Sequence, residues 1–177
     1  MIYMVEMGFP HPERLAEWHD WYLAHIRVLL TVPGFRASQR FAATVDNPSP
    51  YLALHEVCGP GLFDSAAYRG RGGPASVGEW HDLQTNWHRN LLAGLDRTPD
   101  VPADAFLLLL RDVRDIEVPV AVTWLDCIGL DRTVSECGLG VIADPAPFEA
   151  LARRDHRIRL YRPISAKIRA QGQREPA

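Results

Sequence analysis

A stripe of apolar and aromatic side chains along residues 15–29 constrains the fold more than any other feature of this chain. Its members recur at three- and four-residue spacing and are Leu15, Trp18, Tyr22, Ile26 and Leu29. That period predicts an amphipathic helix with one buried face. Residues 2–8, before the helix, and residues 35–44, after Pro33-Gly34, have the composition of strands. The chain therefore begins as strand, helix, strand.

The rest of the first hundred residues continues this alternation. Residues 51–57 are a further strand-like run, joined to the previous one by a turn-rich segment. Ser76-Val77-Gly78-Glu79 has the form of a capping box, which predicts a second helix with an apolar stripe from Trp80 to Leu95. This order, with one more strand to follow, predicts an α+β fold: a ferredoxin-like antiparallel sheet with helices on one face.

The segment Thr98-Pro99-Asp100-Val101-Pro102 is the best internal boundary. It separates a ferredoxin-like unit at residues 1–97 from a β-rich region at 98–165, which a polar tail at 166–177 follows. In the second region we expect strands at 106–110, 118–128, 139–142 and 157–161 and a short helix at 147–153. The region is either a degenerate second copy that has lost its first helix, or an extension of the first sheet or of its dimer interface. We expect a homodimer, because the open face of such a sheet needs cover.

Composition and motifs exclude several classes of function. A net charge of −3 argues against nucleic-acid binding. The sequence contains no run of about 18 apolar residues, so we expect no membrane-spanning helix. The first residues lack the basic and cleavage regions of a secretory signal, so we expect a cytoplasmic protein. We also expect no cofactor and no metal, because dinucleotide and phosphate-loop motifs are absent. His81 and His88, seven residues apart, are too widely spaced for a typical metal pair on a helix.

His25 is the first candidate for chemistry. It lies one position from the buried stripe, near Trp18, Trp21 and Tyr22 on the helix surface. A titratable imidazole among large aromatic residues can line a small-molecule pocket. The alternative is a core or rim histidine that finds a hydrogen-bond partner.

Two strands supply further candidates. Alternation along residues 51–57 puts Tyr51 and His55 on one face, and one or two imidazoles with a phenol suit proton transfer beside a carbonyl or enol. His55 could equally face a subunit interface. Arg36 and Arg40 lie an even number of residues apart, so they could bind a carboxylate together or form surface ion pairs. Arg71, among glycines, is a second candidate anion site.

A family resemblance connects these residues. The segment Trp21-Tyr22-Leu23-Ala24-His25, before Val32-Pro33-Gly34-Phe35, resembles the first-helix signature of EthD-like proteins of the dimeric α/β-barrel superfamily. There an aromatic pair precedes a histidine, and a glycine begins the second strand. The resemblance covers residues 1–97 and implies a ligand between sheet and helices, where His55 and Tyr51 could face His25. It also implies small cofactor-free enzymes, among them isomerases, decarboxylases and ring-fission-product enzymes, besides heme-degrading and quinol-oxidising monooxygenases.

We therefore expect a cofactor-independent isomerase or an ester- or lactone-cleaving enzyme. Its substrate would be a small carboxylated metabolite derived from an aromatic compound or from ring fission. His25 would be the acid/base, with His55 and Tyr51 in support, and the substrate-binding residues would be Arg40, Arg36, Trp21, Trp18, Tyr22 and Arg71. Two alternatives stay open: a non-catalytic small-molecule-binding or accessory subunit, and a cofactor-free monooxygenase that acts on an electron-rich quinol.

Overall fold

A computed structural model describes residues 1–73 and 76–171 of the protein. These residues form nine strands and several helices. The first half holds β1 (Ile2–Gly8), η1 (Pro12–Arg14), α1 (Leu15–Leu29), β2 (Phe35–Ala43), β3 (Tyr51–Val57), η2 (Pro60–Asp64), α2 (Ala66–Arg71), α3 (Trp80–Leu83) and β4 (Thr85–Ala93). The second half holds β5 (Phe106–Arg111), β6 (Thr123–Leu130), β7 (Glu136–Ile142), α4 (Ala146–Arg154), β8 (Ile158–Pro163) and β9 (Ile168–Arg169).

The strands form one closed antiparallel barrel. The order is β3-β1-β4-β6-β7-β5-β8-β2, and β2 pairs back with β3 to close it, while β9 adds to the free part of β2. The predicted ferredoxin-like open sheet with helices on one face is therefore wrong. Both edges of the first four strands are taken by strands of the second half, since β4 pairs with β6 and β2 with β8. Closure satisfies the edge hydrogen bonds that an open sheet would expose.

The two halves of the barrel repeat one strand order. The first half reads β2-β3-β1-β4 and the second reads β6-β7-β5-β8. A loop, residues 112–122, stands where a helix joins the corresponding strands of the first half. The division of the chain at residues 98–102, and the interpretation of residues 98–165 as a degenerate second copy or as an extension, stay predictions. Of the predicted tail, 168–169 form β9 and 172–177 lie outside the described residues. The homodimer stays a prediction.

The helix expected from Trp80 to Leu95 is wrong beyond its first turn. Only Trp80–Leu83 is helical, and β4 follows between β1 and β6. The Ser76 hydroxyl donates to the carbonyl of Gly73 at 2.7 Å and caps no helix. Trp87 and Leu91 are four residues apart, which fits one face of a helix and one face of a strand equally well. Pairing with two neighbouring strands decides for the strand.

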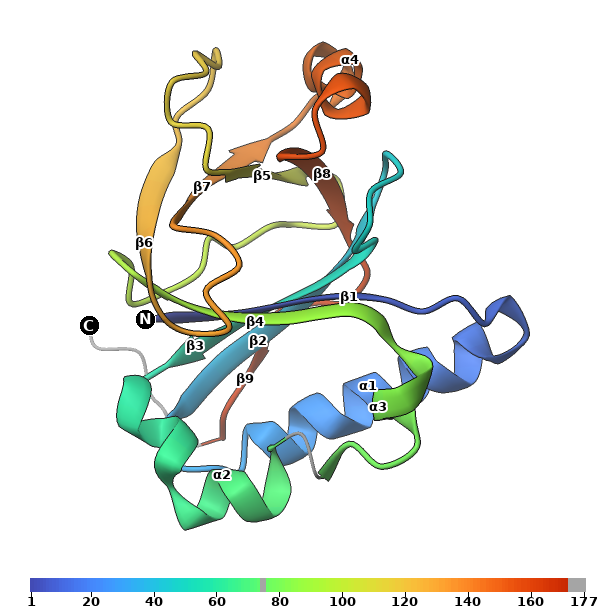
Figure 1. Cartoon of the computed structure of the whole chain (residues 1–177), viewed down its shortest axis with the longest axis vertical. Coiled ribbons are helices and arrows are strands. Elements are labelled where there is room, and N and C mark those ends of the chain that lie inside the picture. Colours follow the sequence, from blue (N-terminus) through green and yellow to red (C-terminus); the bar gives the residue numbers. More distant parts are fainter. Residues whose placement is uncertain (74–75, 172–177) are drawn as a thin grey trace.

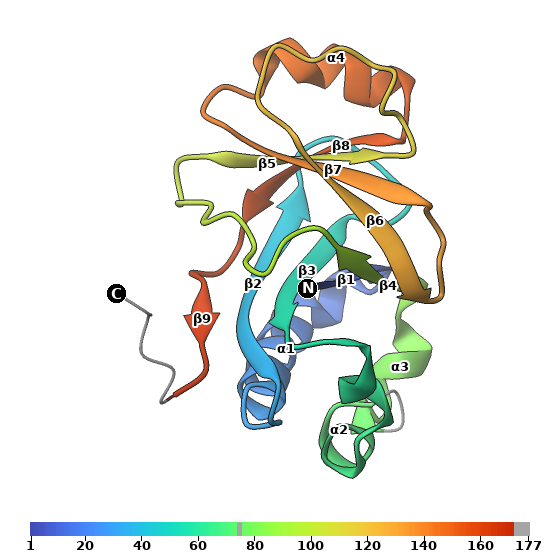
Figure 2. The ribbon, with the colours of Figure 1, turned by 90° about the vertical axis from the view of Figure 1, so that its left-hand side faces the viewer.

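Helices cover the barrel on two opposite sides (Figure 1 and Figure 2). α1, α2 and α3 lie against the outer face of the first-half strands, and α4 lies across the second half. Along β1 the side chains of Ile2 and Met4 point into the barrel, whereas Tyr3 and Val5 point outward and pack under the helices. No helix in the described part of the chain is long and apolar enough to cross a membrane.

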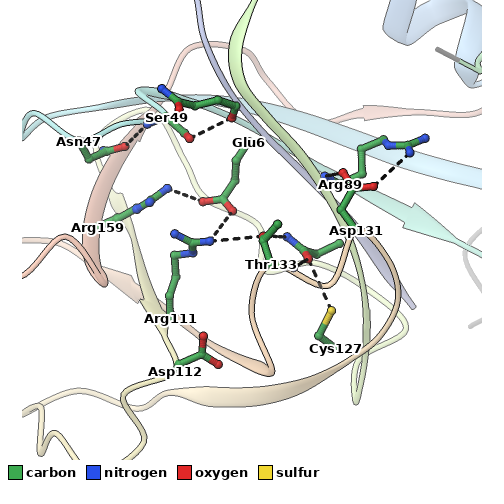
Figure 3. A network of polar contacts seen from close by, with 12 residues as sticks. Glu6, Asn47, Ser49, Arg89, Arg111, Asp112, Cys127, Asp131, Thr133 and Arg159 are labelled. Carbon is green, nitrogen blue, oxygen red and sulfur yellow. Dashed lines mark hydrogen bonds and ion pairs between the residues drawn. The ribbon is translucent and has the colours of Figure 1, made fainter. Parts of the chain in front are cut away.

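A charged network lies at one end of the barrel interior (Figure 3). Glu6 is fully buried and accepts a hydrogen bond from Nη1 of Arg159, and Nη2 of Arg111 lies 3.5 Å from its other oxygen. Beside this pair, Asn90 accepts from the backbone N–H of Thr133 at 2.8 Å and donates to its hydroxyl at 2.9 Å. These contacts tie β1 to β5 and β8 across the barrel.

Candidate functional site

A small cavity lies outside the barrel, between the outer face of β1, β3 and β4 and the helices α1 and α2. Its volume is ≈ 30 Å³, enough for one or two water molecules. The aromatic side chains that line it are two imidazoles, three phenols and two indoles: His25, His55, Tyr3, Tyr22, Tyr68, Trp21 and Trp87. The cavity is thus small, aromatic and rich in groups that can exchange protons.

His25 reaches this cavity from α1. Its ring stacks on Trp21, with 5.2 Å between ring centroids and 13° between planes, and meets the edge of Tyr22. Burial lowers the pKa of His25 to about 4, because the apolar surroundings disfavour the charged imidazolium. His25 is therefore neutral at physiological pH and can accept a proton.

His55 reaches the same cavity from β3. Ser38 lies opposite it on β2, and the Ser38 hydroxyl oxygen is 2.7 Å from Nδ1 of His55. The other ring nitrogen, Nε2, is buried and has no hydrogen-bond partner among the described residues. Burial, and then repulsion from the protonated form of His25 and from Arg40, lower the pKa of His55 to about 3. Two neutral imidazoles therefore line one cavity.

Phenols form another part of the wall. The hydroxyl oxygens of Tyr3 and Tyr68 are 3.5 Å apart, and Tyr3 stacks on His55 with 5.2 Å between centroids. Burial, followed by Tyr68, raises the pKa of Tyr3 well above its usual value. The Tyr3 hydroxyl is thus a neutral donor at physiological pH.

Arg40 is a buried cation close to the site. It is 2% exposed, and its guanidinium carbon lies 4.1 Å from the ring centroid of Tyr22 and 4.8 Å from that of Trp18. Nη1 donates to the carbonyl of His19 at 3.3 Å. Among the described residues, Nη2 has no hydrogen-bond partner and no carboxylate lies within 4.0 Å of the guanidinium. Burial lowers the pKa of Arg40 to about 10. Its positive charge is uncompensated, which favours an anion nearby.

The structure brings only some of the predicted site residues together. His25, His55, Trp21 and Tyr22 line the cavity, as described above. Tyr51 lies on the predicted face of its strand but packs against other rings, 4.8 Å from Trp18 and 5.3 Å from His19 between centroids. Trp18 itself is fully buried in the core and stacks on Phe9.

The predicted arginine pair does not form. A register shift between Phe35 and Ala37 interrupts the alternation of β2, so Arg36 is exposed while Arg40 is buried. Arg71 is also exposed and donates to the hydroxyl of Thr31 at 3.5 Å, away from the cavity lining. A cavity anchor made of several arginines is therefore absent from the described residues.

Sequence reasoning missed Tyr3, Tyr68 and Trp87 as cavity residues. Tyr3 and Trp87 are separated in sequence by most of the first half and line one cavity because β1 pairs with β4. Ser38 could have been found from the sequence. It shares a strand face with Arg40, and the register of the β2–β3 hairpin places it opposite His55.

A larger groove elsewhere carries less chemistry. It has a volume of ≈ 800 Å³ and lies between residues 100–103 and 163–167. Its one cation, Lys167, is neutralised by Glu56 at 2.7 Å and Asp100 at 2.9 Å. The described residues also contain no cluster of three or more potential metal ligands. The histidine cavity is therefore the stronger candidate site.

Comparison with known proteins supports the fold. The chain is similar to the crystal structure of an anthrone oxidase-like protein, with a TM-score of 0.63 and 11% sequence identity over 99% of this chain and 95% of the other. At this identity the likeness concerns the fold alone. No protein-family model and no curated protein matches the sequence. The barrel agrees with the broad resemblance to α/β-barrel proteins, whereas the EthD-like assignment stays a prediction.

Proposed function

We propose that this protein is a cofactor-free oxygenase that oxidises a small, electron-rich aromatic compound with an acidic C–H or O–H group. The observation that carries the proposal is the convergence of two neutral imidazoles, His25 and His55, on one aromatic cavity beside the uncompensated cation Arg40. The name of the similar structure, an anthrone oxidase-like protein, supports the same class of reaction. This is the alternative that the sequence left open, and it replaces isomerisation as the preferred function.

The chemistry begins with proton removal. His25 takes a proton from the activated C–H of the substrate, and the anion that forms is stabilised by the positive potential of Arg40. The electron-rich carbon adds dioxygen, so that a C–O bond forms and the peroxide takes a proton from His25. The remaining C–H bond and the O–O bond then break together: the C–H electron pair forms the carbonyl, and the proton leaves with the outer oxygen as water. A CH₂ group between two aryl rings thus becomes a carbonyl, and each turnover consumes one O₂ and releases one H₂O.

The size of the cavity sets how substrate enters. A volume of ≈ 30 Å³ holds a molecule the size of water or dioxygen, but not an aromatic ring system. Trp21 and Trp87 are only partly buried and pack at the margin of the aromatic core. In the proposed reaction the substrate displaces these indoles and places its reactive carbon against the imidazoles.

The first test uses anthrone as substrate. We expect the purified protein to consume oxygen and to form the corresponding diketone. An oxygen electrode measures the first and absorbance measures the second. His25→Gln should lose about 10²- to 10⁴-fold in kcat/KM, the usual contribution of a general base. His156→Gln, an exposed histidine between α4 and β8, is the control and should keep full activity. The absence of oxygen consumption above the buffer rate with anthrone and phenolic analogues would contradict the proposal.

Arg40→Met separates an electrostatic role from a structural one. The replacement removes an unpaired buried charge, which stabilises, and two stacking contacts, each worth about 0.5–2 kcal/mol, which destabilises. We expect a net change in the free energy of unfolding within about 1 kcal/mol and a loss of at least about tenfold in kcat/KM. A strong loss of stability with unchanged activity would show that Arg40 serves only the core.

Proton transfer without oxygen is the second candidate function. The same two imidazoles, one as base and one as proton donor, are sufficient for isomerisation of an enolisable carbonyl compound or for lactone cleavage. Turnover that continues at the same rate under nitrogen, with no oxygen consumed, would favour it.

A further inference from the structure

We propose that Ser38 is a positioning residue that fixes the tautomer of His55, so that His55 presents an N–H donor to the cavity and leaves His25 as the imidazole base. The tautomer follows from the geometry of Ser38 and His55 alone. The division of labour between the two histidines rests on the proposed function.

The contact is set by the sheet. Ser38 and His55 are direct partners in the register of β2 and β3, and both side chains are about 1% exposed. The oxygen of Ser38 lies 2.7 Å from Nδ1 of His55. Tyr3 stacks on the imidazole with 5.2 Å between centroids, and Phe35 meets it edge to face with 5.8 Å between centroids. The ring is therefore held in place by packing as well as by the hydrogen bond.

The hydrogen-bonding capacity of the two groups determines which one donates. Among the described residues, Nδ1 of His55 is the one acceptor within hydrogen-bond distance of the Ser38 hydroxyl. If Ser38 donates, Nδ1 is unprotonated and the neutral ring carries its hydrogen on Nε2. If Nδ1–H donated instead, the buried hydroxyl hydrogen and the lone pair of Nε2 would both lack a partner. Buried polar groups without partners are costly, so the first arrangement is favoured.

The result is a donor aimed at the ligand. Nε2 is buried and unpartnered, and His55 lines the cavity, so an acceptor bound there completes its hydrogen bonding. The low pKa of His55 agrees with a neutral ring, which has one N–H to give. Such a donor stabilises an oxygen that gains negative charge when a C–H bond conjugated with it is broken. The substrate class is therefore an aromatic ketone or phenol whose oxygen is conjugated with the acidic carbon.

The experiment measures the tautomer directly. The full-length protein carrying isotope-labelled histidine is studied by two-bond proton–nitrogen correlation NMR, which distinguishes Nδ1–H from Nε2–H. We expect His55 in the Nε2–H form, a shift to Nδ1–H or to a mixture in Ser38→Ala, and retention in Ser38→Thr, which keeps the hydroxyl. Ser49→Ala, which removes a buried hydroxyl that donates to the carbonyl of Asn86, is the matched control and should leave the His55 signals unchanged.

Two results would overturn the proposal: His55 as the Nδ1–H tautomer in the wild-type protein, or an unchanged tautomer in Ser38→Ala. The wild-type spectrum decides even if the variant does not fold. On anthrone, Ser38→Ala should lower kcat by about 10- to 100-fold with little change in KM, and Ser38→Thr should restore most of it. A wild-type protein without oxidase activity would refute the proposed function and leave the tautomer result standing.

Discussion

Glu6→Gln is the sharpest test of what holds the barrel together. Glu6 is fully buried and, among the described residues, it is the one carboxylate within 4.0 Å of Arg111 and Arg159. The replacement keeps the size and a polar carbonyl but removes the charge. Two arginines then remain inside the barrel with no counter-charge, so the variant measures the cost of isolating them.

The magnitude follows from burial. The side chain of Arg159 is 4% exposed, and breaking such a buried pair costs about 3–5 kcal/mol. The side chain of Arg111 is 16% exposed and gains some hydration, so it adds little. We expect a loss of about 4 kcal/mol, a large part of the roughly 5–15 kcal/mol that stabilises a typical domain. The surface pair of Arg14 and Glu17, with side chains 30% and 60% exposed, gives the contrast, because solvent screens such pairs and they contribute little to stability.

Urea unfolding followed by tryptophan fluorescence measures both variants. Glu6→Gln should lower the midpoint at an unchanged m-value, and the loss should persist in about 1 M salt, because a buried pair is poorly screened. Glu17→Gln should leave the urea midpoint close to that of the wild type. The double variant Glu6→Met with Arg159→Met should regain most of the loss, since apolar side chains often replace a buried pair without cost. A loss below about 1 kcal/mol for Glu6→Gln would refute this account of the interior.

Two further predictions concern the histidines and a turn. The pKa values of His25 and His55 fall from 6.5 in the unfolded chain to about 4 and about 3, so below pH 6.5 the unfolded state binds more protons. The free energy of unfolding should therefore fall as the pH decreases from about 6.5 to 4. His25→Gln and His55→Gln should each reduce the slope of the free energy of unfolding against pH by up to about 1.4 kcal/mol per pH unit. An unchanged slope in both variants would mean that neither ring is buried as described. Gly34 has a φ of 104°, and a Cβ there would lie 2.6 Å from Sγ of Cys58. Gly34→Ala should therefore lower the free energy of unfolding by at least about 1 kcal/mol, measured by thermal or urea unfolding. Gly61→Ala is the control and should not lower it, because a Cβ at Gly61 would have nothing within 4 Å.

Local pattern was sufficient to predict most strands and α1. The stripe on α1 is buried at Trp18, Tyr22, Ile26 and Leu29, as its period predicted. The run Leu107 to Leu110 is fully buried on both faces, because one face fills the barrel and the other packs under α4. In both cases the pattern of apolar side chains alone indicates whether one face or both faces are buried.

Barrel closure could not be read from local pattern. It depends on the pairing of β4 with β6 and of β2 with β8, across long stretches of sequence. The same non-local pairing turned the expected helix at Trp87 and Leu91 into a strand. For the site, helix period and strand alternation were enough to select His25 and His55, and the structure places both at one cavity. The bulge after Phe35, which separates Arg36 from Arg40, had no clear signal in the sequence.

The two halves of the barrel show why the site lies under α1 and not under α4. The sheet face beneath α1 carries the polar side chains of Ser38, Arg40 and His55, and these are tolerated because aromatic rings and a small cavity surround them. The equivalent face beneath α4 carries Leu108 and Leu160 in a cluster of apolar side chains, without buried polar groups among the described residues. An apolar layer gains stability from close packing and offers nothing to a ligand. If the halves are copies, one has kept the costly polar groups that chemistry needs, and the other contributes the apolar packing that offsets their cost.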